Sequence, residues 1–242
     1  PWKEVGPVTG IDGKIPGGYW DPMFFSDDDG RVYLYYGCGA PAIRGLEMDP
    51  ERPNMAISET KKLFAYNPDH EWEHFGEFNE DPSQCWVEGP WMFKNKDTYY
   101  LTYCAPGTQF ATYGMGCYVS KSPMGPFKYQ KLNPILRRTE GLVKGPGHGC
   151  IVRGPKNTIW AFYTCLRCYH HVFERRIGFD PAGFDSEGNL FVHTATDIPQ
   201  WAPGVVRNPQ NENDAGLKPV SINKPVKASS EAPGRMSSYA ND

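Results

Sequence analysis

The sequence predicts an all-β fold in which β-hairpins repeat around an axis, the arrangement of a β-propeller. Three hairpins carry the prediction, and each opens on an ionisable residue: Asp21, Glu88 and His148. Each of these residues lies twelve positions before an aromatic residue in the second strand of its hairpin, and they follow one another at intervals of 67 and 60 residues. A repeat of this period indicates one supersecondary unit used several times, and repeated β-hairpins are typical of propeller blades.

The composition agrees with a turn-rich β protein. The 242 residues include 26 Gly, 23 Pro and 14% aromatic residues, and Gly and Pro punctuate strands but break helices. The formal net charge is −3, and no basic run argues for a nucleic-acid partner. No apolar stretch approaches the roughly 18 residues of a membrane span, so we expect no membrane partner either. The oligomeric state is not indicated.

The first complete hairpin is expected over residues 21–37. Its turn is the acidic run 27–30, which lacks the alternating ligands and distal Glu of an EF-hand and is therefore read as a turn and not as a calcium loop. Residues 42–48 alternate as a third strand, and residues 55–58 are expected to supply the fourth. The polar and aromatic segment 61–84 is interpreted as a functional connection across the channel mouth.

Two further hairpins follow, over residues 88–103 and 148–163. Residues 115–120 continue the second blade as a strand, which a Pro/Gly turn over residues 122–127 ends. Residues 172–192 are interpreted as a last, partly different blade. After residue 204 the aromatic residues become rare and Asn, Pro, Ser and Lys dominate, so residues 205–242 are predicted to be a linker.

The first strand of each blade lies next to the axis of a propeller, so Asp21, Glu88 and His148 are expected to meet at one mouth of the channel. Glu88 stands between two tryptophans, and partial desolvation there would raise its carboxyl pKa and suit it to donating a proton. Asp21 could orient this acid or hold it protonated by like-charge proximity. Three interpretations of His148 stay open: a metal ligand, a substrate contact or a core histidine. Glu88 can also be interpreted as a surface residue at the start of a strand, and Asp21 as an ordinary turn residue.

Other candidates are weaker. The tryptophans near the two carboxyl groups, Trp20, Trp86 and Trp91, are candidate sugar-stacking residues, although core packing is the default for aromatic side chains. Arg175 and Arg176 would direct one guanidinium inward to the substrate and one outward to solvent, unless both lie on the surface.

The cysteines are less informative. The spacing Cys165-Leu166-Arg167-Cys168, with two histidines close behind, resembles a metal or redox motif, but a blade connection explains it equally well. Seven cysteines are an odd number, so at least one has no partner within the chain.

Several motifs in this order resemble glycoside hydrolase family 43 over residues 1–204. They are Trp20-Asp21-Pro22 leading into residues 27–37, Glu88-Gly89-Pro90-Trp91 leading into Tyr99-Tyr100-Leu101, Ser122-Pro123-Met124-Gly125-Pro126-Phe127, Gly145-Pro146-Gly147-His148, and Glu174-Arg175-Arg176. The resemblance implies a five-bladed β-propeller and an enzyme that attacks arabinose- and xylose-containing plant polysaccharides.

The resemblance also implies roles for the candidate residues. Glu88 would be the general acid, and Asp21 the aspartate that tunes its pKa and orients it. His148 would be the axial histidine beside a central, structural calcium ion, and Arg175 or Arg176 a substrate contact. No cofactor is implied for the chemistry itself.

One part of the family pattern is missing. The general base of the family is an Asp on the first blade, upstream of the segment that matches Asp21, and here only Glu4 and Asp12 are acidic before it. Asp12 has the setting of a turn residue. With blades of about 60 residues, residues 1–204 would fill about three and a half blades, so the first blade and the base are expected in a longer polypeptide. Residues from 226 onward resemble the start of a β-sandwich carbohydrate-binding module.

The predicted function is inverting hydrolysis that removes non-reducing-end α-L-arabinofuranosyl or β-D-xylosyl groups from plant oligo- or polysaccharides. Two alternatives stay open: a galactofuranosidase or galactan-acting enzyme on the same scaffold, and a sugar-binding propeller without catalysis. Secretion or periplasmic export is expected, because a polymeric substrate lies outside the cell.

Overall fold

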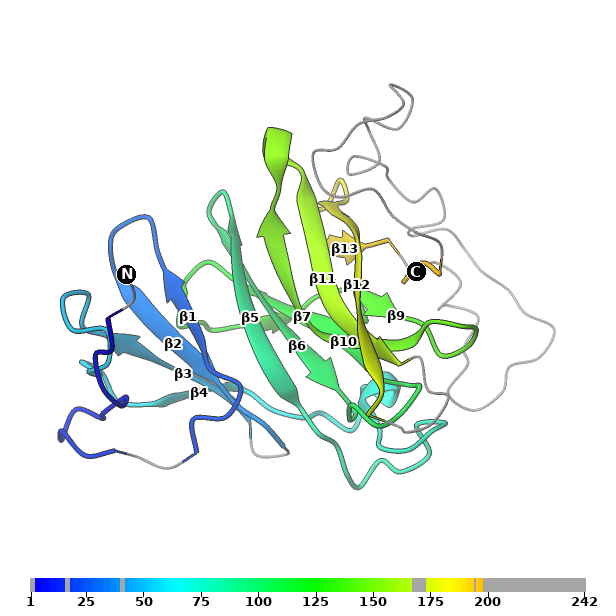
Figure 1. The fold of residues 1–242 in the computed structure, drawn as a ribbon, viewed down its shortest axis with the longest axis horizontal. Coiled ribbons are helices and arrows are strands. Elements are labelled where there is room, and N and C mark those ends of the chain that lie inside the picture. Colours follow the sequence, from blue (N-terminus) through cyan, green and yellow to red (C-terminus); the bar gives the residue numbers. More distant parts are fainter. Residues whose placement is uncertain (1–2, 16–17, 40–41, 167–172, 194, 198–242) are drawn as a thin grey trace.

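A computed structural model of the chain describes residues 3–15, 18–39, 42–166, 173–193 and 195–197. Within these ranges the chain forms three antiparallel sheets that follow one another in sequence order and fan out side by side (Figure 1). The helical segments of this part are single 3-10 turns at Glu71–Glu73 and Pro155–Asn157, and neither could span a membrane. The prediction of an all-β partial propeller is therefore confirmed.

The first sheet has the order β1-β2-β3-β4. Its strands are β1 (Met23–Ser26), β2 (Val32–Tyr36), β3 (Ile43–Met48) and β4 (Lys61–Phe64). The hairpin and the third strand agree with the sequence prediction, but the fourth strand does not. Met55 and Ala56 make only isolated bridges, and the more polar β4 pairs with β3 in their place. An outermost strand needs little apolar surface, which is why alternation did not reveal it.

The second sheet has the order β5-β6-β7-β8, and a further short strand, β9, pairs with β7. The strands are β5 (Glu88–Asn95), β6 (Thr98–Ala105), β7 (Gly114–Ser120), β8 (Lys128–Tyr129) and β9 (Leu136–Arg137). The hairpin and its third strand lie where the sequence predicts them.

The third sheet has the order β10-β11-β12-β13. Its strands are β10 (Lys144–Arg153), β11 (Ile159–Leu166), β12 (Arg175–Phe184) and β13 (Leu190–Val192). The assignment of residues 172–192 to a last, partly different blade is wrong, because β12 pairs with the whole length of β11 and β13 pairs with β12. These strands complete the third blade.

The inner strand of each sheet has a kink in the left-handed region, at Asp21 (φ 51°), Gly89 (φ 60°) and His148 (φ 50°). Each kink lies two residues before uninterrupted pairing begins, at Met23, Trp91 and Cys150 respectively. Gly89, and not Glu88, is therefore the residue equivalent to Asp21 and His148. The second hairpin is one residue shorter, since Trp91 pairs with Thr102 whereas Met23 pairs with Tyr35, and this gave Glu88 the spacing of the other two residues.

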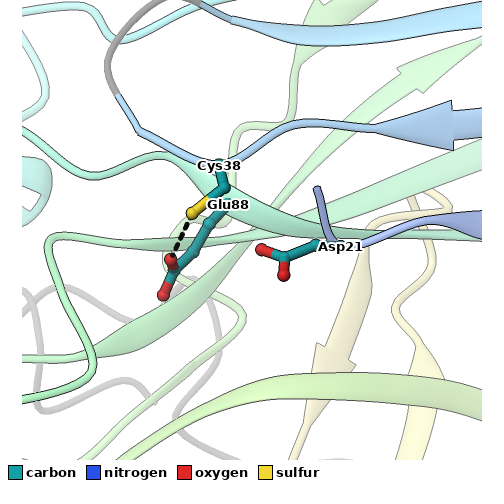
Figure 2. Close-up of side chains that lie close together, drawn as sticks. All are labelled: Asp21, Cys38 and Glu88. Carbon is teal, nitrogen blue, oxygen red and sulfur yellow. Dashed lines mark hydrogen bonds between the residues drawn. The ribbon is translucent and has the colours of Figure 1, made fainter. Parts of the chain in front are cut away.

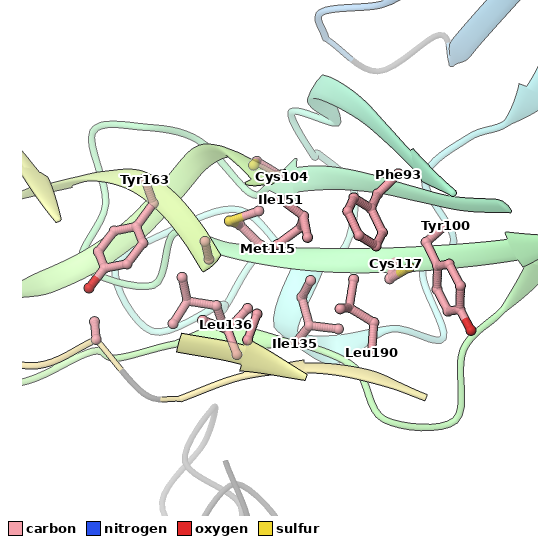
Figure 3. Close-up of a cluster of buried hydrophobic side chains, with 14 of the residues drawn as sticks. Phe93, Tyr100, Cys104, Met115, Cys117, Ile135, Leu136, Ile151, Tyr163 and Leu190 are labelled. Atoms are coloured by element: carbon pink, nitrogen blue, oxygen red, sulfur yellow. The ribbon is translucent and has the colours of Figure 1, made fainter. Parts of the chain in front are cut away.

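Two apolar clusters between the sheets fix the inner strands. One cluster joins the first and second sheets through residues such as Tyr35, Ile43 and Leu101. The other joins the second and third sheets, where Phe93 and Met115 face Ile151 (Figure 3). Burial of aromatic and branched side chains in these layers stabilises the radial packing of the blades.

The segment 61–84 packs against the second sheet. Trp72 is buried, and its Nε1 donates a hydrogen bond of 2.8 Å to the hydroxyl of Tyr129 on β8. His70 stacks on the same tyrosine ring, at 3.7 Å between ring centroids. No residue of this segment lines the cavity described below. The described contacts give Trp72 and His70 a packing role against the second sheet, whereas Phe78 of the same segment is exposed.

Candidate active site

The kinked ends of the three inner strands bring Asp21, Glu88 and His148 together. His148 lies between the two carboxylates: its Nε2 is 3.9 Å from Asp21 Oδ1, and its Nδ1 is 3.9 Å from Glu88 Oε1. The three residues come from different sheets, so the group exists only when the blades are packed. This is the convergence that the hairpin repeat predicts.

Asp21 is half-buried, and its Oδ2 accepts a hydrogen bond of 3.2 Å from the backbone N–H of Gly89. Burial raises the pKa of the Asp21 carboxyl, His148 opposes the rise and the charge of Glu88 adds to it. Of this carboxylate pair, Asp21 is therefore the one that is easier to protonate.

Glu88 is only 6% exposed and has specific partners at both oxygens. Oε1 accepts a hydrogen bond of 2.6 Å from the hydroxyl of Tyr113, and Oε2 accepts a weaker one of 3.4 Å from the thiol of Cys38. Burial by itself would raise the Glu88 pKa, but His148 and Tyr113 outweigh it and the pKa is lowered. The expectation of a raised pKa is thus wrong, because His148 and Tyr113 stabilise the charged carboxylate.

The His148 side chain is 43% exposed and faces the mouth of the site. Its proximity to Glu88 raises the imidazole pKa, burial opposes this, and Asp21 raises the pKa further. Each ring nitrogen faces a carboxylate, so the doubly protonated imidazolium fits this position. A Cβ on Gly89 would lie 3.3 Å from the His148 ring, which makes glycine the residue that lets the imidazole approach.

Cys38 completes the group. Its sulfur accepts a hydrogen bond of 3.0 Å from Trp86 Nε1. This sulfur, one carboxylate oxygen of Asp21 and one of Glu88 all lie within 4.8 Å of one another. The carboxylate of Asp21 points toward the other two side chains (Figure 2). Two carboxylates and a thiol do not match the six to eight oxygen ligands that calcium prefers.

The two arginines point in opposite directions. Arg175 reaches inward: its guanidinium donates to the carbonyl oxygens of Thr108, Gly145 and Thr164, at 2.7, 2.9 and 3.1 Å. Arg176 lies on the surface and pairs with Glu174 at 2.7 Å. Arg175 thus braces the backbone beside the site, while Arg176 meets solvent.

The three candidate tryptophans differ in their surroundings. Trp20 and Trp86 are exposed, and Trp86 is tied to Cys38 next to Glu88. Trp91 is half-buried, packs against the apolar clusters and donates from Nε1 to the carbonyl oxygen of Ile151 at 2.9 Å. Trp86 is therefore the one whose free face lies beside both the solvent and the carboxylate group.

A cavity of about 440 Å³ opens beside the group, along the inner strands. Asp21 and His148 line it, whereas Glu88 is not among its lining residues. Among the described residues of its wall, Asp21 is the sole carboxylate; these residues are Asp21, Pro22, Met23, Gly89, Pro90, Trp91, His148, Gly149, Cys150, Phe162, Tyr163, Thr164 and Ile177. The largely apolar wall with few polar groups is typical of a small-molecule or sugar pocket.

Sequence reasoning missed Cys38 and Tyr113. Neither lies at the start of an inner strand, and each meets Glu88 across 50 and 25 residues of chain respectively, so no local spacing could reveal them. Of the cysteine motif, Cys165 is buried in β11 as part of the apolar core, while Cys168 and the following histidines lie outside the described residues.

Comparison with known proteins adds to this geometry. The family model described as "Glycosyl hydrolases family 43" matches residues 1–190. Among curated proteins, the chain is 26% identical over 62% of its length to the β-D-galactofuranosidase xynD of Aspergillus niger. It is 32% identical over 54% of its length to the arabinoxylan arabinofuranohydrolase of Bacillus subtilis, and 25% identical over 78% to a β-xylosidase of Xylanibacter ruminicola. The chain spans 38%, 26% and 62% of these three relatives.

Solved structures give the same fold. The crystal structure of a thermostable family-43 glycoside hydrolase matches with a TM-score of 0.64 and 25% identity, over 77% of this chain and 61% of that one. A mutant of the GH43 protein BlXynB of Bacillus licheniformis matches with a TM-score of 0.65 and 22% identity, over 82% of this chain and 36% of that one. The second likeness is evidence for the fold alone.

Proposed function

The chain belongs to glycosyl hydrolase family 43, and from this membership together with the Asp21–Glu88–His148 group we propose that it forms part of an enzyme that hydrolyses glycosidic bonds. The observation that carries the proposal is Glu88, a buried carboxyl group held by specific donors next to a second carboxylate and an exposed imidazole, beside an open cavity. A binding module without catalysis would have no need for this arrangement.

The proposed substrates are plant oligo- or polysaccharides that carry α-L-arabinofuranosyl or β-D-xylosyl groups at non-reducing ends. Relatives named arabinofuranohydrolase and β-xylosidase support this class. A relative named galactofuranosidase keeps galactofuranose as the alternative sugar. The exposed ring of Trp86, next to Cys38 and Glu88, is suited to stacking on a sugar face, and the exposed Trp20 stays a candidate for the same role.

Glu88 is the proposed general acid, which protonates the glycosidic oxygen as the bond breaks. The lowered Glu88 pKa and the raised His148 pKa both favour the ion pair in which the imidazole carries the proton. A neutral sugar seated over the exposed imidazole would desolvate it and disfavour its charge. The proton would then move toward Glu88, so that the acid carries its proton when the substrate is in place.

Asp21 is proposed to tune and orient Glu88. A carboxylate oxygen of Asp21 and one of Glu88 lie within 4.8 Å of each other. The two carboxyl groups of an inverting acid–base pair need to be about 6.5 to 9.5 Å apart to admit a water. The base of an inverting reaction would therefore be another carboxylate of the whole protein, as the family pattern implies. The short separation favours one alternative, a retaining reaction with Asp21 as nucleophile, which the anomeric configuration of the product tests.

Further parts of the proposal rest on the family and the sequence. Arg175 and Arg176 stay candidate substrate contacts, and a structural calcium ion beside His148 stays a prediction. Because the described side chains around His148 do not form a calcium-like oxygen shell, no step of the proposed reaction passes through the ion. Export from the cytoplasm and a carbohydrate-binding module after residue 226 are likewise proposed.

The test is hydrolysis of a panel of aryl α-L-arabinofuranosides, β-D-xylopyranosides and β-D-galactofuranosides by the whole protein. Proton NMR of the first product formed then reports its anomeric configuration. We expect release of arabinose or xylose with inversion. Retention would assign Asp21 as nucleophile, and sugar binding without any hydrolysis would favour the non-catalytic propeller.

A further inference from the structure

Tyr113 is a buried neighbour of Glu88. It is 0% exposed, and its hydroxyl donates to Glu88 Oε1 at 2.6 Å. The same hydroxyl oxygen lies 3.4 Å from Nδ1 of His148. A phenol has one proton to donate, so donation to Glu88 leaves its oxygen free to accept from the imidazolium. Tyr113 thereby joins the carboxyl and imidazole of the site in one hydrogen-bonded chain.

Residues of β10 and β12 pack against the Tyr113 ring and restrict its position. A Cβ on Gly147, in β10, would lie 2.3 Å from the Tyr113 ring, so glycine at this position makes room for it. The guanidinium carbon of Arg175 lies 5.4 Å from the centre of the ring, and this guanidinium is itself fixed by backbone carbonyl groups. A slot formed by β10 and β12 therefore holds a ring that contributes a single hydroxyl to Glu88.

On the basis of the function proposed above, we propose that Tyr113 is a positioning residue that holds the carboxyl group of Glu88 in place through Oε1. The hydroxyl of Tyr113 is the closer and stronger donor to Glu88, at 2.6 Å from Oε1, whereas the weakly donating thiol of Cys38 lies 3.4 Å from Oε2. Donation from Tyr113 stabilises the charged carboxylate and fixes the orientation of its two oxygens. Tyr113 touches neither the substrate nor the breaking bond.

The decisive variant is Tyr113→Phe, which keeps the ring and removes the donor. Loss of a hydrogen bond to a charged group should raise the Glu88 pKa by about one unit. The carboxyl titration is followed by NMR of the whole protein labelled with ¹³C-glutamate, and the Glu88→Gln spectrum identifies the Glu88 signal. Hydrolysis should show the alkaline limb of its pH profile shifted upward by the same amount, with a larger fall in kcat than change in KM.

The chain offers a matched control. Tyr103 is a buried tyrosine whose hydroxyl donates to Glu73, and Glu73 contacts His70 at 2.8 Å, so the second set has the same three residue types away from the site. Tyr103→Phe should leave the Glu88 titration and the pH profile unchanged. An unshifted Glu88 pKa in Tyr113→Phe, or an equal shift in Tyr103→Phe, overturns the positioning role.

A second variant covers the case in which Tyr113→Phe does not fold. Replacement of Tyr113 by 3-fluorotyrosine keeps the shape and gives a more acidic phenol, which should lower the Glu88 pKa. An unchanged or raised value contradicts the proposal. The titration needs no substrate, so it decides the role of Tyr113 even if no glycoside is hydrolysed. Conversely, if Glu88→Gln abolishes hydrolysis but neither Tyr113 variant shifts the Glu88 titration, the proposed function holds and the positioning role of Tyr113 fails.

Discussion

The backbone amide of Gly89 donates a hydrogen bond of 3.2 Å to Oδ2 of Asp21, across 68 residues of sequence. The residue that follows the proposed acid is thus bonded directly to the proposed modulator of that acid. Any movement of the second blade relative to the first would change both the orientation of Glu88 and the charge that it senses.

Replacement of the proposed acid should separate binding from turnover. We expect Glu88→Gln to lower kcat by about 10²- to 10⁴-fold for substrates with poor leaving groups, because the amide cannot donate the proton. Aryl glycosides with acidic phenol leaving groups should lose less. Affinity measured by calorimetry should change little, and unchanged turnover would show that Glu88 is not the acid.

The close approach of His148 to Gly89 can be tested with a pair of glycines. Gly89→Ala should cost about 1 to 2 kcal/mol of unfolding free energy from its left-handed φ, and should also displace His148 and reduce turnover. Gly13 has a φ of 74°, and a Cβ added there would have no atom within 4 Å, so Gly13→Ala should show the backbone cost alone. Urea unfolding and turnover are measured for both. Equal turnover in the two variants would argue against any role of the His148 position.

Cys38 should give a slow, strongly pH-dependent inactivation by alkylation. Burial raises the pKa of its thiol to about 11, with Glu88 and Asp21 adding to the rise, so the reactive thiolate is scarce at neutral pH. The rate with iodoacetamide should climb about tenfold per pH unit below that value. A bulky group 3.4 Å from Glu88 should block turnover, and Cys38→Ser should protect the enzyme. A rate that levels off near pH 8 would contradict the raised pKa.

The two adjacent arginines should differ sharply when replaced. Arg175→Ala removes donors from three backbone carbonyl groups and should lower the unfolding free energy by about 2 kcal/mol or more. Arg176→Ala should stay within about 0.5 kcal/mol, since Arg176 is exposed. A rise in KM for Arg176→Ala without loss of stability would instead identify it as a substrate contact. Urea midpoints and Michaelis constants distinguish these results.

The hairpins could be predicted because their information is local. Alternating apolar residues, a polar turn and a second aromatic strand place the β1–β2, β5–β6 and β10–β11 hairpins within a few residues. The short fourth strand of the first sheet was not predictable in this way, because β4 has only one buried side chain. Its pairing depends on the edge that β3 offers.

The site was predictable only in part. The position of Asp21, Glu88 and His148 follows from strand order around an axis. Burial raises the pKa of Glu88, and His148, which the repeat predicts, lowers it together with Tyr113 and Cys38, which distant loops supply. Flanking tryptophans suggested a desolvated acid, but Trp86 turns its ring to solvent. The contributions of Tyr113 and Cys38 depend on tertiary contacts that no sequence spacing encodes.

The three inner strands share a left-handed kink, but the residue at the kink differs from blade to blade. An aspartate, a glycine and a histidine occupy one backbone conformation in three blades, while the pairing beyond Met23, Trp91 and Cys150 is alike in all of them. The kinked position of each inner strand can therefore carry different side chains without a change in strand pairing. Selection could vary the groups presented there one blade at a time, and so diversify reactivity while the surrounding framework stays intact.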